Sequence, residues 1–265
     1  MDIIAFLILL ISGFVFGIIS SIAGVGGGVF FVSFMVLLYA IPINIAIDTS
    51  ILIILISSGA GCITYFKAER LNFKQVLIFS SFSILGGFCS TLLFLFIELD
   101  NTILKISFAS ILLVAGLNMI YKAIKTKNEK ENQDGIKFTN VDLQLHDYKT
   151  NLKKSIPLFF LAGFIANLLG VGGGIINTPV LHIILNYPIH NATAISVGII
   201  FFTAIYNTIA KSIVGQINYI IGIFIGIGSI AGSICGAKIS GKMPKKQLQF
   251  FVAIVLMGLA IRMYF

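Results

Sequence analysis

The sequence predicts an all-α polytopic membrane protein with about ten transmembrane segments. Of the 265 residues, 58% are hydrophobic and only 11% are charged, whereas a soluble domain carries roughly 25% charged residues. The mean hydropathy is +1.04, and the apolar residues gather in long runs with few charges. Runs of about 20 apolar residues match the thickness of the hydrocarbon core of a bilayer.

Five apolar segments precede a polar stretch and five follow it. Most are long enough to cross a bilayer, but the second and the seventh would rise only about 21 Å as helices. Each of these two short segments begins at a GVGGG motif. The predicted segments are residues 3–22, 27–41, 44–66, 75–97, 102–121, 155–169, 174–187, 190–210, 217–240 and 247–265.

The distribution of basic residues predicts the orientation of the chain. If all ten segments cross and both termini lie outside, only Lys105, Lys211 and Arg262 of the 18 Lys and Arg residues fall in outside positions. Cytoplasmic connections of membrane proteins carry such an excess of positive charge. We therefore expect a multi-pass protein of the cell (plasma) membrane with a cytoplasmic linker at residues 122–154. The net charge of +8 is thus a topology signal and indicates no nucleic-acid partner.

An internal duplication relates the two sides of the linker. At a constant offset of 146 positions, Gly24–Gly28 matches Gly170–Gly174, and Pro42, Ser50 and Asn72 match Pro188, Ser196 and Asn218. The register holds without a gap for about seventy residues, which indicates a true repeat.

Each half contains an odd number of crossings, so the second half must enter the membrane from the opposite face. The expected architecture is therefore two inverted five-helix repeats with broken, short Gly-rich helices, an arrangement common in secondary transporters. We divide the chain into a first transmembrane repeat at residues 1–121, the polar linker at 122–154 and a second transmembrane repeat at 155–265.

The GVGGG motifs predict two breaks with free backbone N–H groups. Glycine permits positive φ and close backbone approach. A break followed by a short helix presents N–H groups at a helix N-terminus, which suits an anion. Glycines in membrane helices also serve close helix packing alone. The density of this cluster, its duplication and its place before a short segment favour a binding site.

Polar side chains near the breaks are the further candidate ligands. Hydroxyl and amide groups suit an oxyanion, although a single Ser or Thr often bonds a carbonyl of a neighbouring helix. No Lys or Arg is expected deep in a segment, so neutral donors and backbone dipoles would hold the anion. Asn207 lies deep in the eighth segment. The predicted substrate-binding residues are Gly24, Gly26, Gly27, Gly28, Gly170, Gly172, Gly173, Gly174, Asn167, Asn177, Thr178, Ser50 and Ser196.

Asp48 and His190 are the candidates for proton coupling. Asp48 is the one carboxylate well within an apolar segment, and ionisable groups inside membranes are functional hypotheses by default. Asp48 as a helix cap and His190 as an ordinary hydrogen-bonded side chain are the alternatives. The cysteines form no CxxC pair and no HExxH or paired-Asp constellation is present. We therefore expect no metal, no cofactor, no catalytic residues and no enzymatic activity.

One motif has a recognisable family pattern. Gly170–Gly174 is followed by Pro179 and Leu181, and then by Ala192 and Ser196. The first half repeats the glycine cluster but has Ser33 where the proline would stand. Over essentially the whole chain this pattern resembles the TauE/SafE family of sulfite exporters, also called TSUP.

The resemblance implies transport of small sulfur-containing anions, such as sulfite, organosulfonates or thiosulfate, and export is common in the family. With inverted repeats, we expect a secondary transporter that works by alternating access in the lipid bilayer. An anion uniporter or channel for other small organic or inorganic anions, on the same scaffold, is the alternative.

Overall fold

The secondary structure of the described chain is entirely helical. The computed structural model describes residues 3–96, 100–125, 142–143, 148–240, 253–254 and 257–263. Within these ranges six helices are long and apolar enough to span a membrane, which confirms the predicted all-α polytopic membrane fold. They are α1 (Ile3–Ala23), α3 (Ile43–Lys67), α4 (Phe73–Phe96), α7 (Lys149–Leu169), α9 (Ile189–Val214) and α10 (Tyr219–Ile239).

The short Gly-rich helices lie where the sequence predicts them. α2 (Gly28–Tyr39) and α8 (Gly174–Pro179) both begin at the last glycine of a GVGGG motif. The fifth predicted segment is α5 (Asn101–Lys125). Much of the predicted segment 247–265 and of the linker 122–154 lies outside the described residues, although 253–254 and 257–263 are helical.

A proline makes the second short helix differ from the first. Pro179 has no backbone N–H to donate, and the chain continues after it as a π-helix, η1 (Val180–Ile184). Beyond η1, the N–H of Leu185 donates to the Val180 carbonyl at 3.1 Å. In the first half Ser33 occupies the equivalent position, and α2 remains an α-helix to Tyr39. The absent proline thus explains the regular geometry of α2.

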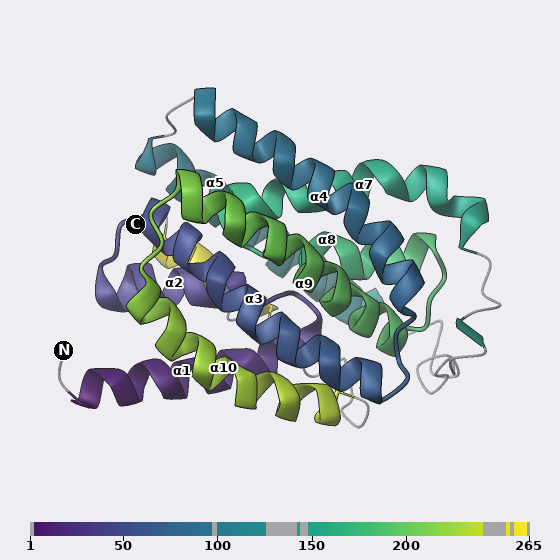
Figure 1. Cartoon of the computed structure of the whole chain (residues 1–265), viewed down its shortest axis with the longest axis horizontal. Coiled ribbons are helices and arrows are strands. Elements are labelled where there is room, and N and C mark those ends of the chain that lie inside the picture. Colours follow the sequence, from purple (N-terminus) through teal and green to yellow (C-terminus); the bar gives the residue numbers. More distant parts are fainter. Residues whose placement is uncertain are drawn as a thin grey trace.

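The helices form a row with α3 and α9 at its centre (Figure 1). The order of packed neighbours is α1, α10, α3, α9, α4 and α7, while α2 packs on α3 and α8 packs on α9. Adding 146 to the residue numbers converts α1 to α7, α3 to α9 and α4 to α10. The row therefore maps onto itself in reverse, as a pseudo-two-fold axis at the α3–α9 contact would require.

Glycines bring the outer helix pairs into backbone contact. A Cβ atom on Gly86 of α4 would overlap the carbonyl oxygen of Phe160 on α7, and one on Gly163 would overlap that of Ser83. At the other end of the row, a Cβ atom on Gly232 of α10 would overlap the Phe14 carbonyl oxygen of α1. Close backbone approach of this kind holds membrane helices together in the absence of a hydrophobic drive between them.

We predict that Gly86→Ala destabilises the protein by about 1–3 kcal/mol, because the added methyl group overpacks the α4–α7 contact. Gly258→Ala is the control, since a Cβ atom there meets nothing within 4 Å. Thermal unfolding of the detergent-solubilised variants measures both. Equal melting temperatures for the two variants would contradict the close approach of α4 and α7.

Candidate functional site

Each GVGGG loop depends on three glycines in left-handed backbone conformation. Residues with a side chain avoid this region at a cost of roughly 1–2 kcal/mol each. The equivalent angles in the two loops agree within 4°, so both copies adopt one conformation. The φ values are 66°, 91° and 75° at Gly24, Gly26 and Gly27, and 65°, 87° and 71° at Gly170, Gly172 and Gly173.

The fourth glycine of each motif is required by a close approach between the two loops. A Cβ atom on Gly28 would overlap the carbonyl oxygen of Gly170, and one on Gly174 would overlap that of Gly24. Between these contacts, a Cβ atom on Gly26 would lie 3.3 Å from the Cα atom of Gly172, and the reverse distance is also 3.3 Å. The two loops therefore cross backbone against backbone.

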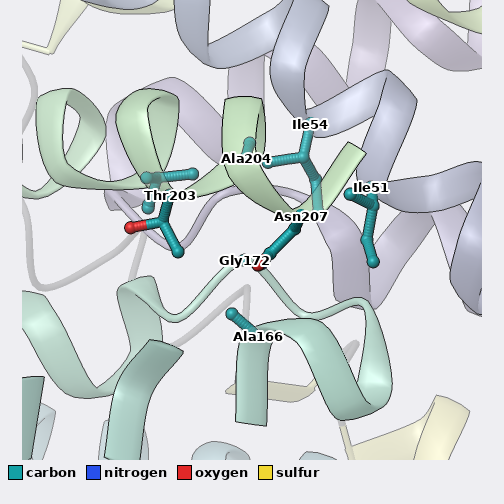
Figure 2. A pocket seen from close by; sticks show the side chains of 8 residues that line it. Ile51, Ile54, Ala166, Gly172, Thr203, Ala204 and Asn207 are labelled. Atoms are coloured by element: carbon teal, nitrogen blue, oxygen red, sulfur yellow. The ribbon is translucent and has the colours of Figure 1, made fainter. Parts of the chain in front are cut away.

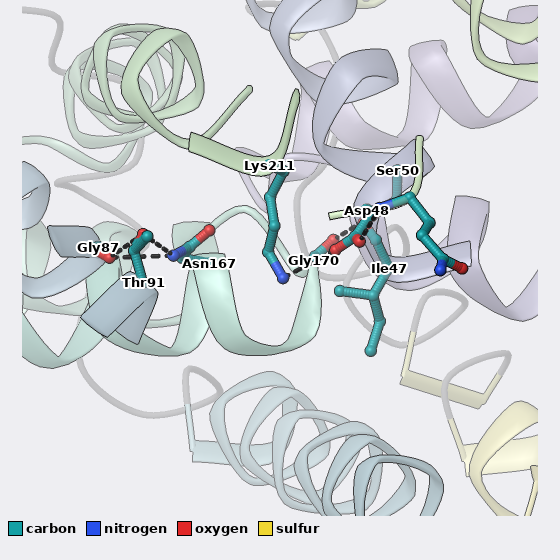
Figure 3. A network of polar contacts seen from close by, with 9 residues as sticks. Ile47, Asp48, Ser50, Gly87, Thr91, Asn167, Gly170 and Lys211 are labelled. Atoms are coloured by element: carbon teal, nitrogen blue, oxygen red, sulfur yellow. Dashed lines mark hydrogen bonds and ion pairs between the residues drawn. The ribbon is translucent and has the colours of Figure 1, made fainter. Parts of the chain in front are cut away.

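Two serines hold the crossed loops from opposite halves of the chain. The Ser50 hydroxyl on α3 donates to the Gly170 carbonyl at 2.9 Å (Figure 3), and the Ser196 hydroxyl on α9 donates to the Gly24 carbonyl at 3.0 Å. These two bonds are equivalent under the offset of 146. Thr178 on α8 also donates to the Gly24 carbonyl at 3.0 Å. In this conformation the three hydroxyls therefore fix the loops, although the sequence predicts them as substrate ligands.

The loops leave consecutive backbone N–H groups without partners. Within the described residues, no hydrogen bond is formed by the N–H groups of residues 25–29 or 171–175. The next N–H groups along each chain donate back to the loop, as Phe31 and Asn177 do to the carbonyls of Gly27 and Gly173. Buried N–H groups are rarely left without an acceptor. Both loops can thus donate to water or to an anion.

A small cavity adjoins the crossing point (Figure 2). It is lined by residues of α3, α7, α9 and the second loop, and its space suffices for about one water molecule. This space is too small for an oxyanion such as sulfite. The lining residues are Ile51, Ile54, Ala166, Gly172, Ile200, Thr203, Ala204 and Asn207.

Two asparagines carry buried oxygens without a partner near this cavity. Asn207 is 2% exposed, and its Oδ1 atom has no hydrogen-bond partner in the described structure. Asn167 donates from Nδ2 to the Gly87 carbonyl at 3.0 Å and to the Thr91 hydroxyl at 2.9 Å, but its Oδ1 atom is likewise unpartnered (Figure 3). A buried amide oxygen without a hydrogen-bond partner costs about 1–3 kcal/mol, so both oxygens are candidates to bind water or a ligand.

Asp48 forms an ion pair with a lysine that sequence reasoning placed elsewhere. The Lys211 ammonium lies 2.8 Å from Asp48 Oδ1, and the two side chains are 6% and 8% exposed. The sequence predicts Lys211 in a connection after residue 210, but α9 continues to Val214 and includes it. Lys211 is thus a buried cation in the last turn of α9, which the sequence did not predict. A buried carboxylate needs a counter-charge. The presence of Asp48 within an apolar segment could therefore have indicated that a basic residue such as Lys211 is also buried.

The remaining predicted residues lie apart from the cavity. Asn177 on α8 is buried and its Oδ1 atom has no partner in the described structure. His190 is buried in the first turn of α9 and does not line the cavity. The structure thus brings the glycine loops, Ser50, Ser196 and Thr178 together and places Asn207 in the wall of the cavity. Asn167, three residues before the second loop, bonds α4.

Broken helices inside an all-α membrane protein are common in secondary transporters, and comparison with known sequences identifies the family. The pattern of the family described as sulfite exporter TauE/SafE matches residues 9–263. The chain belongs to this family. It is accordingly a membrane transporter and not an enzyme.

Curated relatives cover almost the whole chain. A probable membrane transporter protein of Methanocaldococcus jannaschii, MJ0441, is 30% identical over 95% of this chain and 93% of its own length. The probable membrane transporter proteins YunE and YdhB of Bacillus subtilis are 25% and 24% identical, over 95% and 94% of this chain and 94% and 96% of their own lengths. No solved structure matches the chain.

We predict that Ser50→Ala impairs the protein more than Ser196→Ala does. Ser50 is the one described side chain that donates to the Gly170 carbonyl, whereas Thr178 still serves the Gly24 carbonyl when Ser196 is lost. Leaving a buried acceptor unsatisfied costs about 1–3 kcal/mol. The melting temperatures of the purified variants test the order.

Ser81→Ala is the control for this comparison, because the Ser81 hydroxyl is exposed and bonds its own helix at the Leu77 carbonyl. Its melting temperature should equal that of the unmodified protein. A larger effect of Ser196→Ala than of Ser50→Ala would show that the loops are not held as described.

Proposed function

We propose that the protein is a secondary transporter that exports small sulfur-containing anions, such as sulfite or organosulfonates, by alternating access. The observation that carries the proposal is the pair of crossed glycine loops, whose N–H groups at residues 25–29 and 171–175 have no described acceptor. Helix N-termini with free N–H groups favour anions through hydrogen bonding and the helix dipole. Family membership supports the choice of a sulfur oxyanion.

The proposed mechanism uses two inverted halves that exchange conformations. Residues 1–121 and 155–265 are the two repeats, and residues 122–154 form the cytoplasmic linker between them, with both termini outside. The row of helices that maps onto itself under the offset of 146 supports this division. If the axis lies in the membrane plane, swapping the two conformations opens the site to the opposite side.

Two isoleucines are the proposed gates of the site. Ile200 Cδ1 would lie 3.2 Å from a Cβ atom on Gly26, and Ile54 Cδ1 would lie 3.5 Å from one on Gly172. Both also line the cavity. They occupy equivalent positions in the two halves, so each can serve as the apolar gate on one side. Movement of one isoleucine away from the crossing would enlarge the cavity enough to admit an anion.

The roles of the polar residues follow from their contacts. The loop N–H groups of both motifs, with Asn167 and Asn207, are the proposed ligands of the anion. Ser50, Ser196 and Thr178 position the loops that carry those N–H groups. Asn177 is a proposed donor at the second loop. Asp48 and His190 are the proposed residues for coupling transport to protons.

Flux measurements in proteoliposomes test the function. The purified protein is reconstituted, and uptake of sulfite, thiosulfate, sulfoacetate, sulfate and a carboxylate is compared with and without a pH gradient. We expect saturable transport of one or more of the sulfur anions, accelerated by the gradient. Conductive flux that ignores the pH gradient would instead identify an anion uniporter or channel. Absence of flux for every sulfur anion would overturn the proposal.

We predict that Asn207→Leu stabilises the protein and slows transport at least tenfold. The leucine removes a buried oxygen without a partner, and relieving such a penalty is worth about 1–3 kcal/mol, but it also removes a polar wall of the cavity. Thr208→Val is the matched control, because the adjacent Thr208 hydroxyl is also buried and unpartnered in the described structure yet does not line the cavity. Flux and melting temperature are measured for both.

Thr208→Val should gain stability and keep its flux. Unchanged flux in Asn207→Leu would remove Asn207 from the site, and equal losses of flux in both variants would indicate a general disturbance of α9.

A further inference from the structure

We propose that Lys211 supplies the positive charge that binds the transported anion, and that Asp48 occupies this cation until the anion replaces it. This inference rests on the proposed anion transport. It assigns the counter-charge of the site to a residue that lies outside the glycine motifs.

The first observation is that this ion pair is alone in the described interior. Lys211 and Asp48 are the only Lys, Arg, Asp or Glu residues that are buried among those the structure describes. Removing two charges from water costs several kcal/mol per ion, and the attraction between them often fails to restore it. A pair of apolar residues would stabilise the fold at least as well. The retained charges therefore indicate a use other than stability.

The pair also lies on the faces of α9 and α3 that form the cavity. Thr203, Asn207 and Lys211 follow one another at intervals of four residues on α9, so they share one face of the helix. The first two line the cavity. On α3, Asp48 precedes the lining residue Ile51 by one turn. The ion pair thus continues the cavity wall one turn further along both helices.

Each charge has a second partner that remains when the pair separates. The Lys211 ammonium lies 3.5 Å from the centre of the Phe94 ring, a cation–π contact. Asp48 Oδ2 accepts the backbone N–H of Gln216 at 2.8 Å. Removing one member of a buried ion pair leaves the other charge without a partner. Here each charge would keep one contact if the two side chains separated. The arrangement therefore suits an exchange of partners.

The connection after α9 provides space for the Asp48 carboxylate. A Cβ atom on Gly215 would overlap Asp48 Oδ2, although the φ of −100° at Gly215 is accessible to any residue. Space, and not backbone conformation, is thus the reason for glycine here. The carboxylate packs against the connection between α9 and α10. The backbone N–H of Gln216, in this connection, donates to it and holds it there.

The equivalent positions in the other half contain no charges. Adding or subtracting 146 relates Asp48 to Ala194 and Lys211 to Tyr65. The Tyr65 hydroxyl donates to the Ser21 carbonyl at 2.8 Å and belongs to the packed interior. The ion pair is therefore not part of the structure that the two repeats share. In the view of Figure 3 the Lys211 side chain is drawn between Asn167 and Asp48, with its ammonium group directed toward the carboxylate.

Sulfite binding to the purified protein, measured by isothermal titration calorimetry, tests the exchange. Lys211→Gln should weaken the affinity by about tenfold to a hundredfold, the range for loss of a hydrogen bond to a charged group. Lys211→Arg keeps the charge and should stay within about threefold of the unmodified protein. Asp48→Asn removes the competitor and should tighten binding severalfold. Lys238→Gln, at an exposed lysine of α10, should have no effect.

The double variant Asp48→Asn/Lys211→Gln separates binding from folding. It removes both charges, so its melting temperature should be near that of the unmodified protein while its sulfite affinity stays as low as that of Lys211→Gln. Restored affinity in the double variant, or weaker binding in Asp48→Asn, would overturn the inference and make the pair a structural element. If the unmodified protein binds no sulfur anion, the proposed function fails first, and the inference fails with it.

Discussion

The structure depends on hydrogen bonds to the carbonyl groups of two loops buried in an apolar interior. An unpartnered carbonyl or N–H group there costs several kcal/mol. The carbonyls of Gly24 and Gly170 meet this constraint through serines of the opposite half, Ser196 and Ser50. Each break in a helix is therefore completed by the other half of the chain. Contacts between the halves thus contribute to the conformation of both loops.

The two repeats share their backbone arrangement but differ in several buried polar side chains. The glycine conformations, the serine bonds and the row of helices obey one offset. The polar side chains of Asn167, Asn207 and Lys211 do not, because Ser21, Gly61 and Tyr65 stand at the equivalent positions. The two halves are thus alike in the contacts that satisfy the loop carbonyls and differ in these three polar side chains.

The sequence predicts most of the helices and both glycine breaks, but fewer of the contacts at the candidate site. The glycine clusters located the breaks, because few sequences other than Gly-Val-Gly-Gly-Gly tolerate both positive φ and a second loop in contact. The end of α9 was missed, because an apolar run that stops at Ala210 gives no sign that helix and burial continue through Lys211. A lysine stem is itself apolar and packs readily. The bonds of Ser50 and Ser196 were also hidden, because a hydroxyl in a sequence does not reveal which carbonyl it will face.

The contact between Gly26 and Gly172 has a mechanical consequence. Interlocking side chains ordinarily resist rotation of one packed element against another, because each rearrangement requires new rotamers. Here two backbones touch at a point where neither residue has a side chain. Turning one loop over the other changes no rotamer at that point. The contact between Gly26 and Gly172, beside the cavity, therefore offers no side-chain obstacle to rotation of one loop against the other.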